Sequence, residues 1–343
     1  MSKLKEYLTK ALAFPAEIHL ESNSGCNARC VMCPRDGMER YQGDMSRELF
    51  IKAIDECGEH PEMTYIHFHM SGEPLLLDID ELCWRINYAR EKNPQEFRGH
   101  YDFQRKEFKT PSLCFFTNGS LLTEDKIEKL LKTPLDIIVI SIDGGTKEDY
   151  EKIRVGLKFE TVVENVRKLV ELRNKMGSDM KIQTAIVPQK ANENSVGLYH
   201  KLFREMGVDD VGGSGVQNIG GLVDSESMIL DTQYMGGDIN SPCWRVFLDL
   251  SVTADGKAVV CCQDVRAMEV VGDLNTQSIK EIWQRGRMMD IRNMFAVGRK
   301  DDIPFCANCD SMKSMCLGNF PQWKLSPEFV RTFIDVCKEL GVY

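Results

Sequence analysis

The sequence predicts an α/β protein in which a parallel sheet, covered by helices, curves into a full or partial barrel, followed by a small C-terminal appendage. Between residues 17 and 213, short β-rich runs alternate six times with segments of helical periodicity. Apolar runs such as Ile-Ile-Val-Ile at 137–140 suit strands that are buried on both faces of a parallel sheet. After residue 212, glycines and cysteines replace this alternation. Ligands are expected at the C-terminal ends of the strands.

The predicted elements follow in order along the chain. Strands are expected at 17–22, 63–70, 113–117, 135–142, 181–187 and 209–213, and helices at 46–57, 78–92, 123–131, 159–176 and 193–206. The appendage is predicted to hold a hairpin (247–252 and 258–262), helices at 279–283, from 288 and at 327–340, and a cysteine-rich segment at 306–316. Two domains are expected, 1–235 and 236–343, with an insertion at 93–111.

Composition limits the function classes. The 343 residues carry a net charge of −9, which disfavours binding to nucleic acid or to an anionic membrane surface. The N-terminal residues are followed by no apolar segment of a signal peptide, and the sequence has no run long enough to span a bilayer. A cytoplasmic location is therefore predicted, and the thirteen cysteines are expected to bind metal rather than to form disulfides.

Three of these cysteines follow the first strand on one tight loop: Cys26, Cys30 and Cys33. A cubane [4Fe–4S] cluster has four irons, and thiolates are its usual ligands. Three thiolates leave one iron open, and an open position is typical of a catalytic metal centre. A three-cysteine zinc site is the alternative.

The CxxxCxxC spacing resembles that of the radical S-adenosylmethionine (SAM) superfamily. The resemblance implies that SAM binds the open iron and is cleaved to a 5′-deoxyadenosyl radical, which removes a substrate hydrogen. Gly72-Glu73-Pro74 resembles the family motif that binds the SAM ammonium group, with Ser71 in place of its first glycine. The resemblance also implies cofactor-binding roles for Met32, Gly72, Glu73, Asn118, Ser141, Asp143 and Arg154, with Met32 beside the adenine and Arg154 at the SAM carboxylate. An exposed arginine at a helix end is the alternative for Arg154.

A second set of cysteines lies in the appendage: Cys243, Cys261, Cys306 and Cys309. Four thiols suit a cluster or a structural zinc ion. Their spacing resembles the SPASM/twitch domain of radical SAM enzymes, which implies auxiliary [4Fe–4S] clusters. One auxiliary cluster is expected. In the alternative, Cys316 and Cys337 complete a second with Cys306 and Cys309; otherwise they are a loop thiol and a core helix cysteine.

Two further residues are candidates for catalysis. Cys262 would donate a hydrogen atom to a substrate radical or would be a buried thiol. His67 and His69 alternate along the second strand and so point the same way. His69 is the nearer to the active end and would contact substrate, or it would be a hydrogen-bonded core histidine. Cys57, Cys83 and Cys114 are expected to be core residues.

The preferred function is that of a radical SAM oxidoreductase that dehydrogenates a sugar-like or aminocyclitol-like alcohol, with the auxiliary cluster accepting an electron. The alternatives are an epimerase of a sugar or natural product, a peptide maturase, and a non-catalytic iron–sulfur or zinc protein. Residues 1–16 are too few for a fused peptide-binding domain, which disfavours the maturase. An electron donor of the flavodoxin or ferredoxin type is expected. An acidic donor could dock on a basic group of residues, which would otherwise be ordinary solvated side chains: Arg29, Arg35, Arg40 and Lys52.

Overall fold

The structure is a computed structural model that describes residues 3–61, 63–94, 112–231, 243–311, 335–336 and 339. In this part of the chain, nine strands form one sheet in the order β11-β10-β9-β1-β3-β4-β5-β7-β8. The predicted α/β fold with a parallel sheet is confirmed. The strands are β1 (Glu17–Leu20), β3 (Tyr65–His67), β4 (Ser112–Thr117), β5 (Ile137–Ser141), β7 (Lys181–Ile186), β8 (Asp210–Gly213), β9 (Asp249–Val252), β10 (Lys257–Val259) and β11 (Val270–Asp273).

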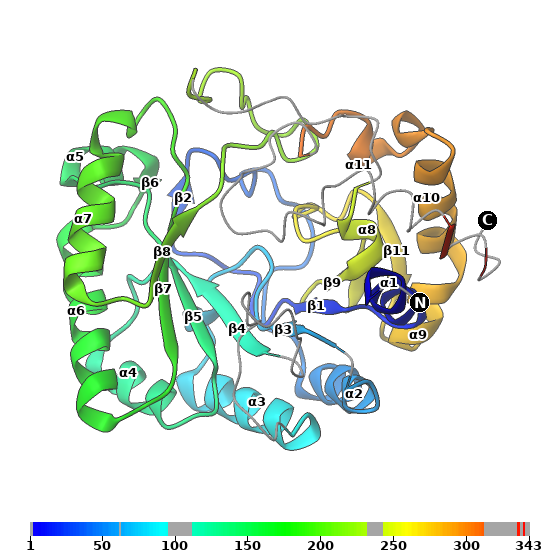
Figure 1. Cartoon of the computed structure of the whole chain (residues 1–343), viewed down its shortest axis with the longest axis horizontal. Helices are drawn as coiled ribbons and strands as arrows, with labels where there is room; N and C mark the ends of the chain where they lie inside the picture. The colour runs from blue at the N-terminus through cyan, green and yellow to red at the C-terminus, as the bar shows by residue number, and fades with distance from the viewer. Residues whose placement is uncertain are drawn as a thin grey trace.

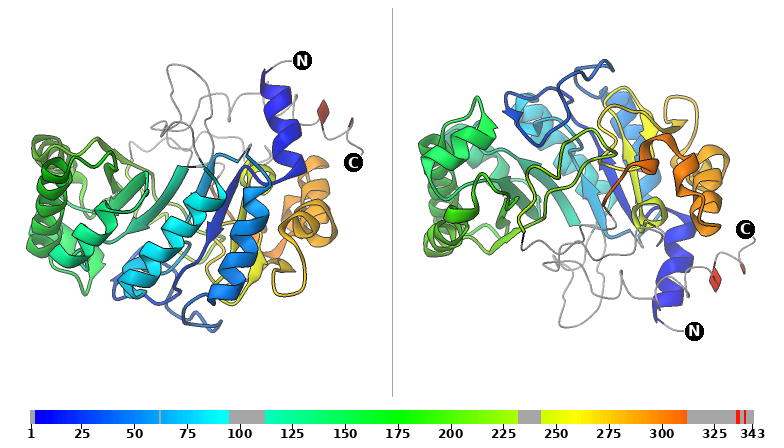
Figure 2. Two further views of the ribbon diagram at one scale, coloured as in Figure 1. Left: turned by 90° about the horizontal axis from the view of Figure 1, so that it is seen from below. Right: turned by 90° about the horizontal axis from the view of Figure 1, so that it is seen from above.

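Six adjacent strands run parallel to one another, as expected for strands joined by helical crossovers: β1, β3, β4, β5, β7 and β8. Helices lie along the outer side of the curved sheet, and loops close over its concave side (Figures 1 and 2). The helices are α1 (Lys3–Ala13), α2 (Arg47–Gly58), α3 (Ile79–Lys92), α4 (Glu124–Leu131), α5 (Lys147–Ile153), α6 (Phe159–Met176), α7 (Val196–Met206), α8 (Arg245–Leu248), α9 (Ile279–Gln284), α10 (Gly286–Ala296) and α11 (Pro304–Ala307). None of the described helices is long and apolar enough to cross a membrane.

Local sequence explains where several helices begin. The side chain of Ser46 accepts a hydrogen bond from the Leu49 amide at the start of α2, and that of Asp78 accepts two at the start of α3. Thr123 caps α4 in the same way. Such caps satisfy amides that have no partner inside the helix.

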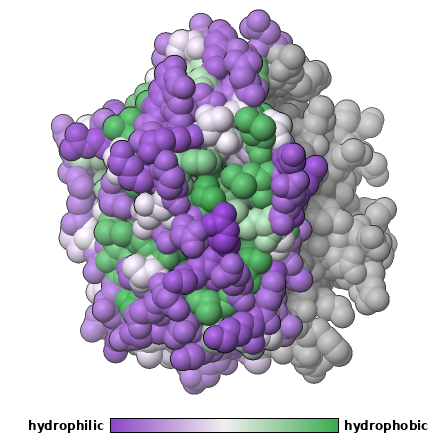
Figure 3. Space-filling view, turned by 90° about the vertical axis from the view of Figure 1, so that its left-hand side faces the viewer, coloured by the Kyte–Doolittle hydropathy of each residue, from purple (hydrophilic) through white to green (hydrophobic). Residues whose placement is uncertain are grey.

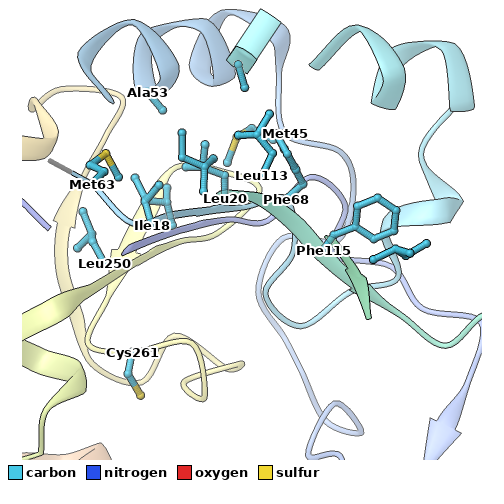
Figure 4. Packing of buried hydrophobic residues seen from close by; sticks show 14 of the residues in the cluster. Ile18, Leu20, Met45, Ala53, Met63, Phe68, Leu113, Phe115, Leu250 and Cys261 are labelled. Atoms are coloured by element: carbon cyan, nitrogen blue, oxygen red, sulfur yellow. The ribbon is translucent and has the colours of Figure 1, made fainter. Parts of the chain in front are cut away.

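The core lies between the sheet and its helices. Ile18, Leu20, Phe68 and Leu113 point from the strands toward α2, whereas Cys261 lies on the other side of the sheet (Figure 4). Alternation along β1 therefore turns its polar residues to the concave side. The face formed by α5, α6 and α7 is hydrophilic over most of its area, with hydrophobic residues between (Figure 3).

The structure differs from the sequence prediction at several points along the chain: α5, β11 and the short pair β2 and β6 were not predicted. No element was predicted before residue 17, but α1 packs beside α9, and the indole nitrogen of Trp283 donates to the Ala11 carbonyl at 2.8 Å. Phe247 lies in α8, not in a strand, because the chain turns helically before it enters β9. The predicted terminal helix, the insertion and the domain boundary lie mostly or wholly outside the described residues.

The hairpin strand β9 pairs with β1 in parallel, with Glu17 opposite Asp249 and Leu20 opposite Val252. The predicted appendage therefore extends the barrel sheet directly. This pairing brings the turn that follows β9 close to the end of β1, where the Ala254 amide donates to Glu21. The residues after β10 reach the loop that follows β1 separately, because Arg40 Nε donates to the Val265 carbonyl at 2.6 Å.

Candidate active site

A cavity of about 460 Å³ lies where β1, β3, β4 and β5 end. Most of the residues predicted to bind the first cluster and SAM line it: Cys26, Cys30, Cys33, Met32, Gly72, Glu73, Asn118, Ser141 and Arg154. His69 and Phe116 line it as well. The strand ends thus bring together residues from four loops that are far apart in the sequence.

The cysteine loop is held by a two-stranded sheet. β2 (Arg29–Cys30) pairs antiparallel with β6 (Arg154–Val155), which places Cys30 opposite Arg154. The Val31 amide donates to the Ile153 carbonyl at 3.0 Å. Burial raises the pKa of Cys30 to about 11, and the positive charge of Arg154 opposes that increase. A bound cation would compensate the charge of such a buried thiolate more fully.

Gly72 and Glu73 form a turn against the residues that precede the cysteine loop. A Cβ atom at position 72 would lie 1.8 Å from the Asn23 carbonyl oxygen, so only glycine fits. Glu73 accepts hydrogen bonds from the Thr117 hydroxyl at 2.6 Å and the Asn118 amide at 2.8 Å. Burial raises the pKa of Glu73, while these hydrogen bonds lower it. The carboxylate is therefore fixed at the cavity wall, where it suits a cationic amine.

Asp143 does not line the cavity. It is fully buried, and its Oδ2 accepts from Arg154 Nε at 2.5 Å while its Oδ1 accepts from the Val187 amide at 2.7 Å. Asp143 instead contacts Arg154, which does line the cavity.

A second, smaller cavity is lined by all four cysteines predicted to bind the auxiliary cluster: Cys243, Cys261, Cys306 and Cys309. Burial and the neighbouring thiols raise the pKa of Cys261 well above its usual value. Four crowded thiols would repel one another as thiolates, so their gathering suits a metal centre that neutralises them. Cys316 and Cys337 lie outside the described residues.

Comparison with known proteins agrees with this geometry. The family model of the Radical SAM superfamily matches residues 20–189, and that of SPASM, an iron–sulfur cluster-binding domain, matches residues 243–310. The chain belongs to the radical SAM superfamily and carries a SPASM domain. It therefore uses SAM and a SAM-binding [4Fe–4S] cluster, together with auxiliary iron–sulfur binding.

Individual relatives of this radical SAM protein are distant. The tungsten-containing aldehyde ferredoxin oxidoreductase cofactor-modifying protein of Pyrococcus furiosus is 26% identical over 193 residues, which are 56% of this chain and only 49% of that protein. The S-adenosyl-L-methionine-dependent 2-deoxy-scyllo-inosamine dehydrogenase of Niallia circulans is 23% identical over 296 residues, 86% of this chain and 92% of that protein. The crystal structure of BtrN with AdoMet and 2-DOIA has a TM-score of 0.55 at 20% identity, covering 86% of this chain and 92% of that one, which shows a shared fold.

The cavity residues of the radical SAM domain fit the cofactors chemically. Three thiols suit iron, the Glu73 carboxylate suits an ammonium group, and the Arg154 guanidinium suits a carboxylate. Met32 and Phe116 add apolar surface to the same wall. The cavity therefore offers a partner for the ammonium group and for the carboxylate of SAM.

The two candidates for catalysis lie in different places. His69 is half-buried at the wall of the first cavity. Cys262 is half-buried, and its sulfur accepts a hydrogen bond from Arg245 at 3.2 Å. Cys57 is in the main core, Cys83 is half-buried on α3, and Cys114 faces the concave side, with its sulfur 2.9 Å from Nδ1 of His67.

Sequence reasoning missed several polar residues on the concave side of the sheet: Glu17, His19, Glu21 and Arg245. Their signal was the alternation of polar residues at 17, 19 and 21 within an otherwise apolar strand. Arg245 gave no local signal, because its position depends on the fold of the SPASM domain.

The basic docking surface predicted for this radical SAM protein is not formed as expected. Arg40 is turned inward, where it donates two hydrogen bonds of 2.7 Å to the buried carboxylate of Glu21. Arg35 donates to the Ser71 carbonyl at 3.0 Å, and Lys52 to the carbonyls of Leu274 and Gln277. Arg29 and Lys52 remain exposed, whereas Arg35 and Arg40 mainly hold neighbouring loops together.

Proposed function

We propose that this radical SAM protein oxidises a hydroxyl-bearing substrate, such as a sugar-like or aminocyclitol-like alcohol, and passes an electron to one auxiliary cluster. The alignment with the 2-deoxy-scyllo-inosamine dehydrogenase, which covers most of both chains, supports this choice. Aminocyclitols such as the 2-deoxy-scyllo-inosamine in that protein's name are therefore the substrates to test first.

The residues of the first cavity prepare the radical. Cys26, Cys30 and Cys33 would hold the SAM-binding cluster, which when bound supplies the electron that cleaves SAM. Glu73 would bind the SAM ammonium group, and Arg154, aimed by Asp143, would bind its carboxylate. Met32 would contact the adenine. Four protein thiols at the second cavity would leave no iron open, which favours electron transfer over substrate binding there.

The observation that carries the proposal is the position of Arg245. Arg245 lines the second cavity and donates a hydrogen bond to Cys262. Its Nη1 also lies 3.6 Å from Oδ2 of Asp249. Asp249 in turn stands opposite Glu17 of β1, on the concave side of the sheet. One side chain therefore joins the proposed auxiliary site to the interior of the barrel. A substrate radical in that interior would lie near an electron acceptor.

Anaerobic reconstitution tests the proposal. We expect about eight irons per chain, 5′-deoxyadenosine on addition of SAM and reductant, and from a panel of aminocyclitols and sugars a product two hydrogens lighter than its substrate. The proposal fails if deoxyadenosine is formed but every alcohol bound is recovered with its mass unchanged.

Epimerisation is the second candidate, because Cys262 is not among the proposed ligands and its thiol is half-buried next to Arg245. A thiol in this place would return a hydrogen atom to a substrate radical. Deuterium from D₂O in a product of otherwise unchanged composition, lost in Cys262→Ala, would favour this function over dehydrogenation.

The proposal includes a small one-electron donor of the flavodoxin or ferredoxin type and a reducing, cytoplasmic environment, which keeps cluster thiols unpaired. Cross-linking of flavodoxin or ferredoxin to the reconstituted protein tests the donor. Support of SAM cleavage by neither donor, with cleavage by dithionite intact, would argue against it.

A further inference from the structure

Three histidines form a group on the concave side of the sheet: His19 on β1 and His67 and His69 on or just after β3. The register pairs His19 with His67, and their rings stack with centroids 4.1 Å apart and planes 4° from parallel. His69 lies edge-on to both, at 5.7 and 5.6 Å. Of the three, His69 lines the SAM cavity.

The hydrogen bonding of His69 fixes its tautomer. The backbone amide of Phe116 donates to Nδ1 of His69 at 3.2 Å. An amide nitrogen can only donate, so Nδ1 must carry a lone pair, and the neutral ring holds its hydrogen on Nε2. Burial and the neighbouring His67 lower the pKa of His69 well below its usual value. At neutral pH the ring is therefore uncharged and offers an N–H donor.

The three rings do not form a metal site in this arrangement, although their nitrogen atoms lie within 4.8 Å of one another. Imidazole binds metal along a lone pair in the ring plane, and the parallel rings of His19 and His67 direct theirs side by side. Nδ1 of His69 is used by Phe116, and Nδ1 of His67 by the Cys114 sulfur. Instead, the stacked rings of His19 and His67 pack against His69 and limit the movement of its ring.

We propose that His69 is a substrate-binding residue whose Nε2–H donates to a hydroxyl oxygen of the substrate and so selects the carbon that faces SAM. This assignment rests on the proposed oxidation of an alcohol. It adds a selectivity: a neutral N–H donor accepts no hydrogen bond from an ammonium group, so a hydroxyl oxygen can bind there and a protonated amino group cannot. An amino substituent of an aminocyclitol would have to face elsewhere.

The donor state can be tested without a known substrate. We would record long-range ¹H–¹⁵N spectra of ¹⁵N-histidine-labelled, reconstituted protein with oxidised clusters and bound SAM at pH 7. The His69 signals are assigned as those missing from His69→Gln, with His200→Gln on α7 as the control. We expect hydrogen on Nε2 and none on Nδ1; hydrogen on Nδ1, or on both nitrogens, overturns the assignment.

Variants test the binding role. Wild type, His69→Gln, which keeps an N–H donor, and His69→Phe are compared with 2-deoxy-scyllo-inosamine and the other alcohols of the panel. We expect His69→Phe to raise KM about tenfold or more and to release more deoxyadenosine per product, with His69→Gln closer to wild type and SAM affinity unchanged. Equal KM and coupling in all three overturn the role of His69 alone. Wild type that oxidises no alcohol overturns the proposed function itself.

Discussion

Asp143 binds Arg154 Nε at 2.5 Å from a position with no exposure to solvent. Asp143 also holds the amide of Val187, just beyond β7, and Arg154 pairs with Cys30 across the β2–β6 sheet. A single carboxylate therefore connects two strand ends to the cysteine loop. Both side chains are largely buried, so the pair is little screened by water.

Asp143→Asn tests this connection. The change removes the negative charge but keeps the size, so Arg154 would lose its ion partner in a buried site. We expect SAM affinity to fall about tenfold or more in the reconstituted protein, measured by equilibrium dialysis. Glu160→Gln, which breaks an exposed pair with Lys147, is the matched control and should leave SAM affinity unchanged. Equal affinities in the two variants would contradict a role for Asp143.

Glu21 joins the two halves of the molecule. Its buried carboxylate accepts two hydrogen bonds from Arg40 and one from the Ala254 amide of the β9–β10 turn. We expect Glu21→Gln to lower the free energy of unfolding by about 3 kcal/mol, because it leaves Arg40 without its counter-charge. Denaturant unfolding under anaerobic conditions measures this. Glu6→Gln, from an exposed pair with Lys10, should change stability by less than about 1 kcal/mol. A loss of less than about 1 kcal/mol in Glu21→Gln as well would mean that the Glu21–Arg40 ion pair does not stabilise the fold.

The histidine group predicts how stability depends on pH. Burial, with contributions from the neighbouring histidines, lowers the pKa of His19 and of His69 well below the unfolded value of about 6.5. Above pH 6.5 both states are neutral at these sites; as pH falls below it, the unfolded chain gains protons first, so stability is lost. Denaturant unfolding between pH 5.5 and 8 should show this loss, and His69→Gln should reduce it. A loss equally steep in His69→Gln would show that His69 does not contribute.

The auxiliary site is tested by Cys261→Ala. Removing one of four thiols should reduce the iron content from about eight to about four per chain, while deoxyadenosine is still formed at the first cavity. Cys83→Ala, on the half-buried face of α3, is the control and should keep all its iron. Full iron content in Cys261→Ala would exclude this cysteine as a ligand.

Helix and strand positions were largely predictable, because each helix buries one apolar stripe against the sheet and periodicity reports that burial. The helix at 159–176 was placed at the observed bounds. Phe247 was misplaced because a single apolar turn of helix looks like the start of a strand in the sequence. Helix α1 was missed because its charged face outweighs a short apolar one.

The candidate site was predictable where its residues are close in sequence or follow strand ends, as for Cys26 and Glu73. Contacts set by strand order were not. The stack of His19 on His67 requires the β1–β3 register, and the inward turn of Arg40 requires the buried carboxylate of Glu21. Asp143 was placed in the right region, but its contact with Arg154 was not foreseen, because a sequence does not show which of two neighbouring polar residues reaches the cavity.

The most direct test of the account is deoxyadenosine release by Cys30→Ala after anaerobic reconstitution with SAM and dithionite. Cys30 lines the first cavity opposite Arg154, far along the chain from the SPASM cysteines. We predict about four irons per chain, held at the second cavity, and no deoxyadenosine above background. Release at the wild-type rate would contradict a SAM-cleaving cluster at Cys26, Cys30 and Cys33.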